Sequence, residues 1–258
     1  MTTLRAERVS AVVPGRRLVY DVDLTVTPGR LLALVGPNGA GKTSLLRLLA
    51  GDLEASSGRV LIGESDVADL HPSELSRLRA YLQHAPAVDI PFSARRVVAL
   101  GRHAYRHDPG NFRERDAQAV VTAMADTETS ELADRSFRTL SGGEQMRVSI
   151  ARVLAQDTPI VLLDEPTAAL DVGHGERVLL RLRNLAQAGK TVVVVLHDLN
   201  AAATHSDEVA VMAEGRIVAL GSPESAFSAT LLSEVYRHPL RVSNHPFGPG
   251  IIVLPEKG

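Results

Sequence analysis

The sequence is poor in the residues on which several kinds of protein depend. It has no cysteine and no tryptophan, aromatic residues make up 3% of its 258 residues, and the formal net charge is −2. Nucleic-acid binding needs basic stripes and stacking platforms, so this composition argues against a nucleic-acid partner. The lack of cysteine is compatible with a reducing compartment.

Long apolar runs are also missing. The longest strand-like run is Val192–Leu196, far below the ~18 residues that a membrane-spanning helix needs. The first residues, Met1–Arg8, mix acid with base and lack the apolar core of a signal peptide. The hydrophobic content of 45% is enough for one large core, or for one core with a small satellite subdomain.

A glycine-rich octapeptide is the most informative segment that the chain does contain. It lies between an apolar strand-like run, Leu31–Val35, and a helix-like run, Ser44–Ala50, and reads Gly36-Pro37-Asn38-Gly39-Ala40-Gly41-Lys42-Thr43. Such a loop turns backbone N–H groups and a helix N-terminus toward phosphates, with the lysine against the β- and γ-phosphates and the threonine hydroxyl on Mg²⁺. A plain glycine-rich turn is the alternative, but the flanking strand and helix favour a phosphate-binding loop that includes Ser44.

A second motif, Leu140-Ser141-Gly142-Gly143-Glu144-Gln145, precedes a helix predicted over Arg147–Leu154. Ser141 is a favourable N-cap residue, and the two glycines permit a ligand to approach the backbone closely.

A third motif is a short apolar run that ends in two acids, within Pro159–Pro166. The run predicts a buried parallel strand, and ligands of open α/β sheets collect at the carboxyl ends of strands. Asp164 is therefore the candidate Mg²⁺ residue, and Glu165 the candidate general base that polarises the attacking water. A strand that ends in a solvated acidic turn is the alternative.

In this order, the three motifs resemble those of ATP-binding cassette (ABC) ATPases. The resemblance implies an α/β fold: a P-loop NTPase core with an antiparallel β subdomain and an inserted α-helical subdomain. A single nucleotide-binding domain would cover residues 1–258, with the core at 1–84 and 157–258 and the helical subdomain at 85–156. The tail predicts a hairpin of Val209–Met212 with Ile217–Leu220, a helix over Ala229–Tyr236 and a last strand, Ile251–Leu254.

The resemblance also implies roles that the spacing alone does not show. Ser141, Gly142 and Gly143 would contact the γ-phosphate that is bound by the other subunit of a homodimer. Gln83 resembles the glutamine that reaches metal and water. His197 resembles the histidine that senses the γ-phosphate, and Asp171 lies in a segment that resembles the D-loop.

The aromatic ring that this family usually places under adenine is missing from the segment before the loop. Tyr20, the nearest ring, falls in a predicted strand, where packing is its expected role. We therefore expect an aliphatic adenine contact from Val13 with the stem of Arg16.

The finer pattern between Gln83 and Arg102, together with the tail, resembles the ATPases of importers of iron-siderophores, vitamin B12 and haem, particularly haem. This implies ATP and Mg²⁺ as cofactors, integral-membrane permease partners, an indirect substrate-binding protein, and a peripheral place on the cytoplasmic face of the cell membrane. A siderophore or cobalamin importer is the main alternative. A detached exporter subunit and a soluble non-transport ABC ATPase are the less favoured ones.

Several other residues allow two interpretations. The histidines His84, His103 and His107 suit solvated surface better than haem ligation. Val97 and Val98 belong either to a groove for a permease helix or to the core of the helical subdomain. The arginines Arg95, Arg96, Arg102 and Arg106 are expected on a helix surface that faces the permease or solvent.

Overall fold

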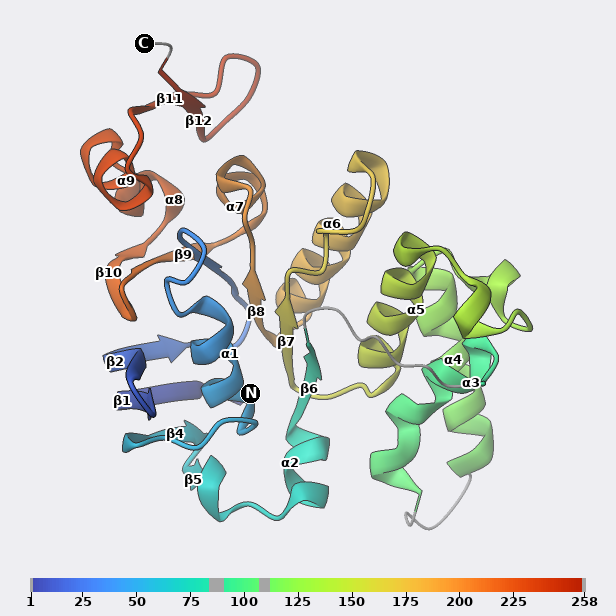
Figure 1. Cartoon of the computed structure of the whole chain (residues 1–258). Helices are drawn as coiled ribbons and strands as arrows, with labels where there is room; N and C mark the ends of the chain where they lie inside the picture. Colours follow the sequence, from blue (N-terminus) through green and yellow to red (C-terminus); the bar gives the residue numbers. More distant parts are fainter. Residues whose placement is uncertain (1, 84–90, 107–111, 257–258) are drawn as a thin grey trace. The chain divides into compact units, whose positions relative to one another are not determined.

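The computed structural model describes residues 2–83, 91–106 and 112–256. The chain divides into two compact units, one made of residues 1–69 with 182–258 and the other of residues 70–181 (Figure 1). The predicted division at residues 84/85 and 156/157 stays a prediction. Each unit is described by itself below.

The first unit begins with an antiparallel sheet, in the order β2-β1-β4-β5 (Figure 1). Buried apolar residues alternate with exposed polar ones along much of its long strands, which is the pattern of a sheet with one face on a core. The predicted antiparallel β subdomain is therefore present. Its elements are β1 (Leu4–Val13), β2 (Arg16–Val26), β4 (Ser57–Ile62), β5 (Ser65–Asp66) and a 3₁₀ helix, Val67–Asp69.

A second sheet in this unit has the order β10-β9-β3-β8. The strands β3 (Leu31–Val35) and β8 (Thr191–Val195) occupy apolar runs that predicted strands. They are buried along their whole length and pair in parallel, which is typical of strands covered on both faces. The helix α1 (Lys42–Ala50) follows β3 and contacts β1 and β8. The hairpin of β9 (Glu208–Ala213) and β10 (Arg216–Gly221) matches the sequence prediction within one residue at each end of each strand.

The tail continues from this hairpin through α8 (Pro223–Ala226) and α9 (Ala229–Tyr236) to the paired strands β11 (Leu240–Asn244) and β12 (Ile251–Pro255). The bounds predicted for α9 are confirmed. Asn200, in α7 (Leu199–His205), ties β12 down: its Nδ2 donates to the Val253 carbonyl at 3.1 Å, and the Val253 N–H donates to its Oδ1 at 2.7 Å.

The second unit holds the parallel pair β6 (Arg79–Leu82) and β7 (Ile160–Asp164) and a group of helices. The helices are α2 (Pro72–Leu78), α3 (Ala94–Ala99), α4 (Phe112–Asp126), α5 (Gly142–Ala155) and α6 (Val172–Gln187), in which the division falls after Arg181. Short 3₁₀ helices occupy Leu100–Tyr105, Ser130–Leu132 and Phe137–Thr139. Apolar side chains of α3, α4 and α5 form one buried cluster around Phe137.

This cluster decides between two interpretations of the α3 valines. Val97 is 4% exposed and Val98 is fully buried, and both belong to the cluster. The interpretation of these two side chains as the lining of a groove is therefore wrong, because both fill the core of the helical cluster. Arg102 also departs from the expected surface position: it is 14% exposed, and its Nε lies 2.6 Å from Asp116 Oδ1.

Within the described ranges, no helix is both long and apolar enough to cross a bilayer, and no three His, Cys, Asp or Glu side chains gather as a metal site. His103 is exposed on the Leu100–Tyr105 helix, as expected of a surface residue. His84 and His107 lie outside the described residues.

We expect Val98→Asp to lower the free energy of unfolding by roughly 3 kcal/mol, because it places a carboxylate without a designed partner in the cluster. Val121→Asp is the matched control, since Val121 is 50% exposed on α4. Thermal and urea unfolding of both variants checks this. Equal stability of the two variants would show that position 98 faces solvent.

Candidate functional site

The octapeptide forms the loop that joins β3 to α1 in the first unit. Its strand is buried, whereas Asn38, Gly39 and Thr43 are exposed on the loop and at the start of the helix, and Ser44 is half-buried. The structure thus places exposed backbone and a hydroxyl at a helix N-terminus, which is the arrangement that favours a bound anion.

Two glycines fix the path of this loop. Gly36 has φ 146°, and a Cβ built on it would lie 2.2 Å from the Met212 carbonyl oxygen of β9. Gly41 has φ 101°, and its Cβ would lie 2.6 Å from the Leu18 carbonyl oxygen of β2. Any side chain at either position would collide with backbone, so the loop can only pack here as glycine.

Lys42 lies inside the loop and is 5% exposed. Its Nζ donates to the Gly36 carbonyl at 2.7 Å and to the Pro37 carbonyl at 3.0 Å. A buried ammonium group needs such partners, and the curled loop supplies them. The charge of Lys42 is therefore held inside the loop by two of the loop's own backbone carbonyls.

The turn of the β9–β10 hairpin supports the loop from the side. The Gly215 N–H donates to the Ala40 carbonyl at 2.9 Å, and the Gly215 carbonyl accepts from the Tyr20 N–H at 2.8 Å. The Tyr20 ring lies against two guanidinium groups, those of Arg17 at 4.4 Å and of Arg216 at 3.8 Å from the ring centroid. Tyr20 therefore lies on a strand, as predicted, and its ring is engaged by arginines.

The β1–β2 turn carries the two residues expected near a nucleotide base. Val13, at the end of β1, is half-buried. The Arg16 Nη2 approaches the loop, within 3.6 Å of a Cβ built on Gly39. The Arg16 backbone pairs with Val13 in the β1–β2 ladder, but its guanidinium makes no hydrogen bond or ion pair with any described residue, so it is available to a ligand at the exposed face of the loop.

His197 follows β8 at the same end of the sheet at which the loop follows β3. The parallel register joins Leu34 to Val195, and the Leu196 N–H donates to the Leu34 carbonyl at 3.1 Å. His197 is exposed just beyond this point, and Asp198 caps α7 through the Asn200 and Ala201 N–H groups. In the first unit the structure thus brings the loop, Arg16 and His197 to one end of the sheet.

A residue of the tail that no sequence motif indicated, Tyr236, reaches the loop. Burial raises the pKa of Tyr236 to about 12, while the nearby backbone of Gly36 acts in the opposite direction. Tyr236 is therefore a neutral hydroxyl beside the first glycine of the loop. Its 200-residue separation from the loop leaves no local signal in the sequence.

The second unit carries three candidate residues at the carboxyl ends of β6 and β7: Gln83, Asp164 and Glu165. The register joins Leu82 to Leu163, so Gln83 and Asp164 follow at the same edge. Asp164 is fully buried, Glu165 is half-buried, and Gln83 is exposed. Glu165 has φ 51°, a left-handed conformation that is uncommon for glutamate and is often found at functional sites.

The second motif of the sequence, Leu140–Gln145, is called the signature below, and its Ser141 is the N-cap of α5, as predicted. The predicted start of the helix at Arg147 is wrong: α5 begins five residues earlier, at Gly142, because the Ser141–Glu144 capping box starts the helix there. Ser141 caps the helix by accepting from the Glu144 N–H, and the Glu144 carboxylate accepts from the Ser141 N–H at 2.7 Å. This backbone hydrogen bond is the main reason that the pKa of Glu144 is lowered. Ser141 and Gly142 are exposed, and a Cβ built on Gly142 would meet open space.

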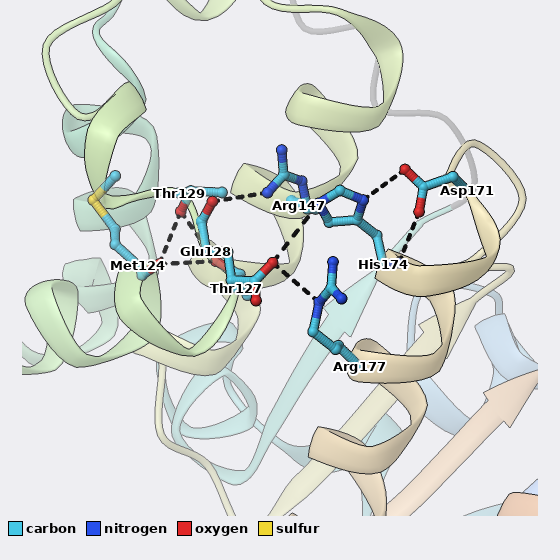
Figure 2. Close-up of polar contacts among 8 residues, drawn as sticks. All are labelled: Met124, Thr127, Glu128, Thr129, Arg147, Asp171, His174 and Arg177. Atoms are coloured by element: carbon cyan, nitrogen blue, oxygen red, sulfur yellow. Dashed lines mark hydrogen bonds and ion pairs between the residues drawn. The ribbon is translucent and has the colours of Figure 1, made fainter.

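Gly143 connects the signature to the segment after Glu165. A Cβ on Gly143 would lie 3.1 Å from the Ala169 carbonyl oxygen, so the two backbones are in close contact. Asp171 ends this segment and holds His174 twice: the His174 N–H donates to Oδ1 at 2.8 Å, and the ring Nδ1 lies 2.7 Å from Oδ2 (Figure 2). No motif of the sequence singled out His174, although its position three residues after a helix-capping aspartate is typical of such a contact.

Sequence comparisons find a family and named relatives that this chain resembles. The profile of the ABC transporter family matches residues 19–168. A protein named hemin import ATP-binding protein HmuV from Nocardia farcinica is 46% identical, over 99% of this chain and 90% of that protein. A protein of the same name from Streptomyces coelicolor is 47% identical, over 94% and 86%.

Solved structures show the same fold. An ABC transporter described as metal-chelate type, in an inward-facing conformation, has a TM-score of 0.83 at 23% identity and covers 100% of this chain and 98% of its own, a likeness of fold alone. The dimeric ATP-binding cassette MJ0796, bound to ADP and Pi, has a TM-score of 0.76 at 27% identity, over 85% and 98%.

Substitution of Arg16 tests whether its guanidinium contributes to nucleotide binding at the loop. We expect Arg16→Ala to weaken binding of a fluorescent ATP analogue about tenfold, the order of one hydrogen bond to a charged group. Arg17→Ala is the matched control, because Arg17 stacks on Tyr20 instead. Equal dissociation constants for the two variants would remove Arg16 from the site.

Proposed function

Since this chain belongs to the ABC transporter family, we propose that it is an ATP-hydrolysing subunit. In this proposal the subunit powers haem import through a membrane permease. The family match and the phosphate-loop geometry support the ATPase activity. Haem is proposed as the substrate because relatives named for hemin import match nearly the whole chain at 46% and 47% identity.

ATP binds at the loop of the first unit. Its triphosphate lies on the backbone N–H groups of the loop and against Lys42, whose ammonium the loop carbonyls already hold in place. Val13 and the stem of Arg16 take the place of an aromatic platform for the base. The residues proposed for the nucleotide bound by the same chain are Gly36, Pro37, Asn38, Gly39, Ala40, Gly41, Lys42, Thr43, Ser44 and Val13, while Ser141, Gly142 and Gly143 are proposed for the nucleotide of the second subunit.

The residues proposed for Mg²⁺ offer the donors that this ion prefers. They are the Thr43 hydroxyl, the Asp164 carboxylate and the Gln83 amide oxygen, and a hard divalent cation takes oxygen ligands of this kind. Thr43 is exposed at the start of α1, and Asp164 ends the buried strand β7. When bound, Mg²⁺ neutralises charge on the phosphate oxygens.

Glu165 acts as the general base on the attacking water, and His197 holds the γ-phosphate. Support for Glu165 comes from its position directly after Asp164 and from its left-handed backbone, which the turn that follows maintains. In that turn the Ala168 N–H donates to the Glu165 carbonyl at 3.2 Å. His197 is supported by its exposure at the edge of the sheet from which the phosphate loop starts.

Hydrolysis needs a homodimer in this proposal. Ser141, Gly142 and Gly143 contact the γ-phosphate that is bound by the second subunit, and the exposure of Ser141 and Gly142 leaves them accessible to it. The dimeric structure of the related cassette MJ0796 supports this assembly. The dimer works at the cytoplasmic face of the membrane, with permease subunits and, indirectly, a substrate-binding protein.

Iron-siderophore and cobalamin importers share the same ATPase chemistry, so the site residues do not choose among substrates. The names of the relatives favour haem over these two, and over an exporter or a non-transport ATPase.

We expect Glu165→Gln to retain ATP binding and to lower the turnover number by a factor of about 10² or more, because the amide cannot accept the proton of the attacking water. Glu214→Gln is the matched control: Glu214 also has positive φ, at 48°, but its side chain is 88% exposed in the β9–β10 turn. Steady-state ATPase assays on both variants check this. Normal turnover of Glu165→Gln would exclude Glu165 as the base.

A further inference from the structure

One residue just after α4, Glu128, connects the signature helix α5 to α6, the helix that follows the turn from Glu165. The Glu128 carbonyl accepts from Arg147 Nη1, on the signature helix α5, at 2.8 Å. Its carboxylate Oε2 lies 3.0 Å from Arg177 Nε and 3.7 Å from His174 Nε2, both on α6. Figure 2 shows Glu128 between these partners, with contacts from its backbone on one side and from its side chain on the other.

The turn that carries Glu128 is held by buried hydroxyls. Thr127 and Thr129 are 5% and 0% exposed, and their Oγ1 atoms lie 3.0 Å apart. Thr127 Oγ1 donates to the Ala123 carbonyl at 3.0 Å, and Thr129 Oγ1 to the Met124 carbonyl at 3.2 Å. Glu128 itself has φ 51°. The backbone from which the Glu128 side chain extends is therefore held by buried hydrogen bonds.

His174 connects this carboxylate to the segment that follows Glu165. Its Nδ1 faces Asp171 Oδ2 and its Nε2 faces the Glu128 carboxylate, so the ring bridges two acids (Figure 2). Asp171 also accepts from the His174 backbone N–H, the main reason that the pKa of Asp171 is lowered.

Asp171 is the far anchor of the turn that begins at Glu165. Within that turn the Ala168 N–H donates to the Glu165 carbonyl, and the Leu170 N–H to the Thr167 carbonyl at 3.1 Å. At its near end the turn continues from the buried strand β7. At its far end it is held by the hydrogen bonds between Asp171 and His174.

We propose that His174 is a positioning residue for hydrolysis: by holding Asp171 through Nδ1, with its ring oriented by Glu128, it fixes the turn that presents Glu165. This inference rests on the proposed function, since it gives Glu165 the role of base. His174 touches neither nucleotide nor water in this scheme. The side chains of Asp171 and Glu128 are 68% and 52% exposed, so their contacts with His174 contribute little to stability and act mainly on geometry.

The test compares three variants of the purified full-length chain in steady-state ATPase assays, with melting temperatures measured alongside. His174→Ala removes both contacts of the ring. His174→Asn places an amide N–H near the position of Nδ1 and keeps the bond to Asp171. Arg177→Ala is the matched control, because Arg177 contacts Glu128 but makes no hydrogen bond to Asp171 among those described.

We expect His174→Ala to lower kcat about tenfold with an unchanged KM for ATP, the pattern of a lost transition-state arrangement. His174→Asn should recover kcat to within about threefold of the wild-type value, and Arg177→Ala should stay within about twofold. All three should melt near the wild-type temperature.

The proposal is overturned if His174→Ala has wild-type kcat, if His174→Asn is as slow as His174→Ala, or if Arg177→Ala is equally slow. A raised KM with normal kcat would overturn it too. A wild-type chain without ATPase activity would contradict the proposed function instead, which keeps the two failures distinct.

Discussion

The contact of the phosphate loop with the backbone beneath it is the constraint on which the nucleotide half of the site depends. Gly36 and Gly41 lie so close to carbonyl oxygens of β9 and β2 that no side chain fits. This packing curls the loop, and the curl directs the Gly36 and Pro37 carbonyls at the ammonium of Lys42. The loop itself thus holds the ammonium in place, and a charge that is fixed in position lowers the cost of binding an anion.

Backbone geometry also determines the position of the acidic residues Asp164 and Glu165. The buried strand β7 carries Asp164 to its end, and the chain then turns at once through the left-handed Glu165. The same turn lies against Gly143 of the signature and ends at the capping residue Asp171. In our proposal, a change at the signature or at the start of α6 acts on the position of Glu165 through these contacts, as expected of coupling carried by packed elements.

Local patterns predicted much of this fold, and long-range contacts account for what they missed. The apolar runs of β3, β7 and β8, the Ser141 cap and the bounds of α9 were readable because burial, capping and periodicity act within a few residues. The burial of Val98 was undecided, since an apolar pair on a helix fits both a groove and a core. The approach of Arg16 to Gly39, and the bridge from His174 to Glu128, join residues 23 and 46 positions apart, which no local rule addresses.

Haem transport by the assembled importer is the most direct test of the central claim. The chain would be reconstituted in liposomes with the permease that co-purifies with it, and the uptake of haem, of a ferric siderophore and of cobalamin measured with and without ATP. The account predicts ATP-dependent accumulation of haem that exceeds that of the other two substrates. ATP-dependent uptake of cobalamin or the siderophore without uptake of haem would contradict it.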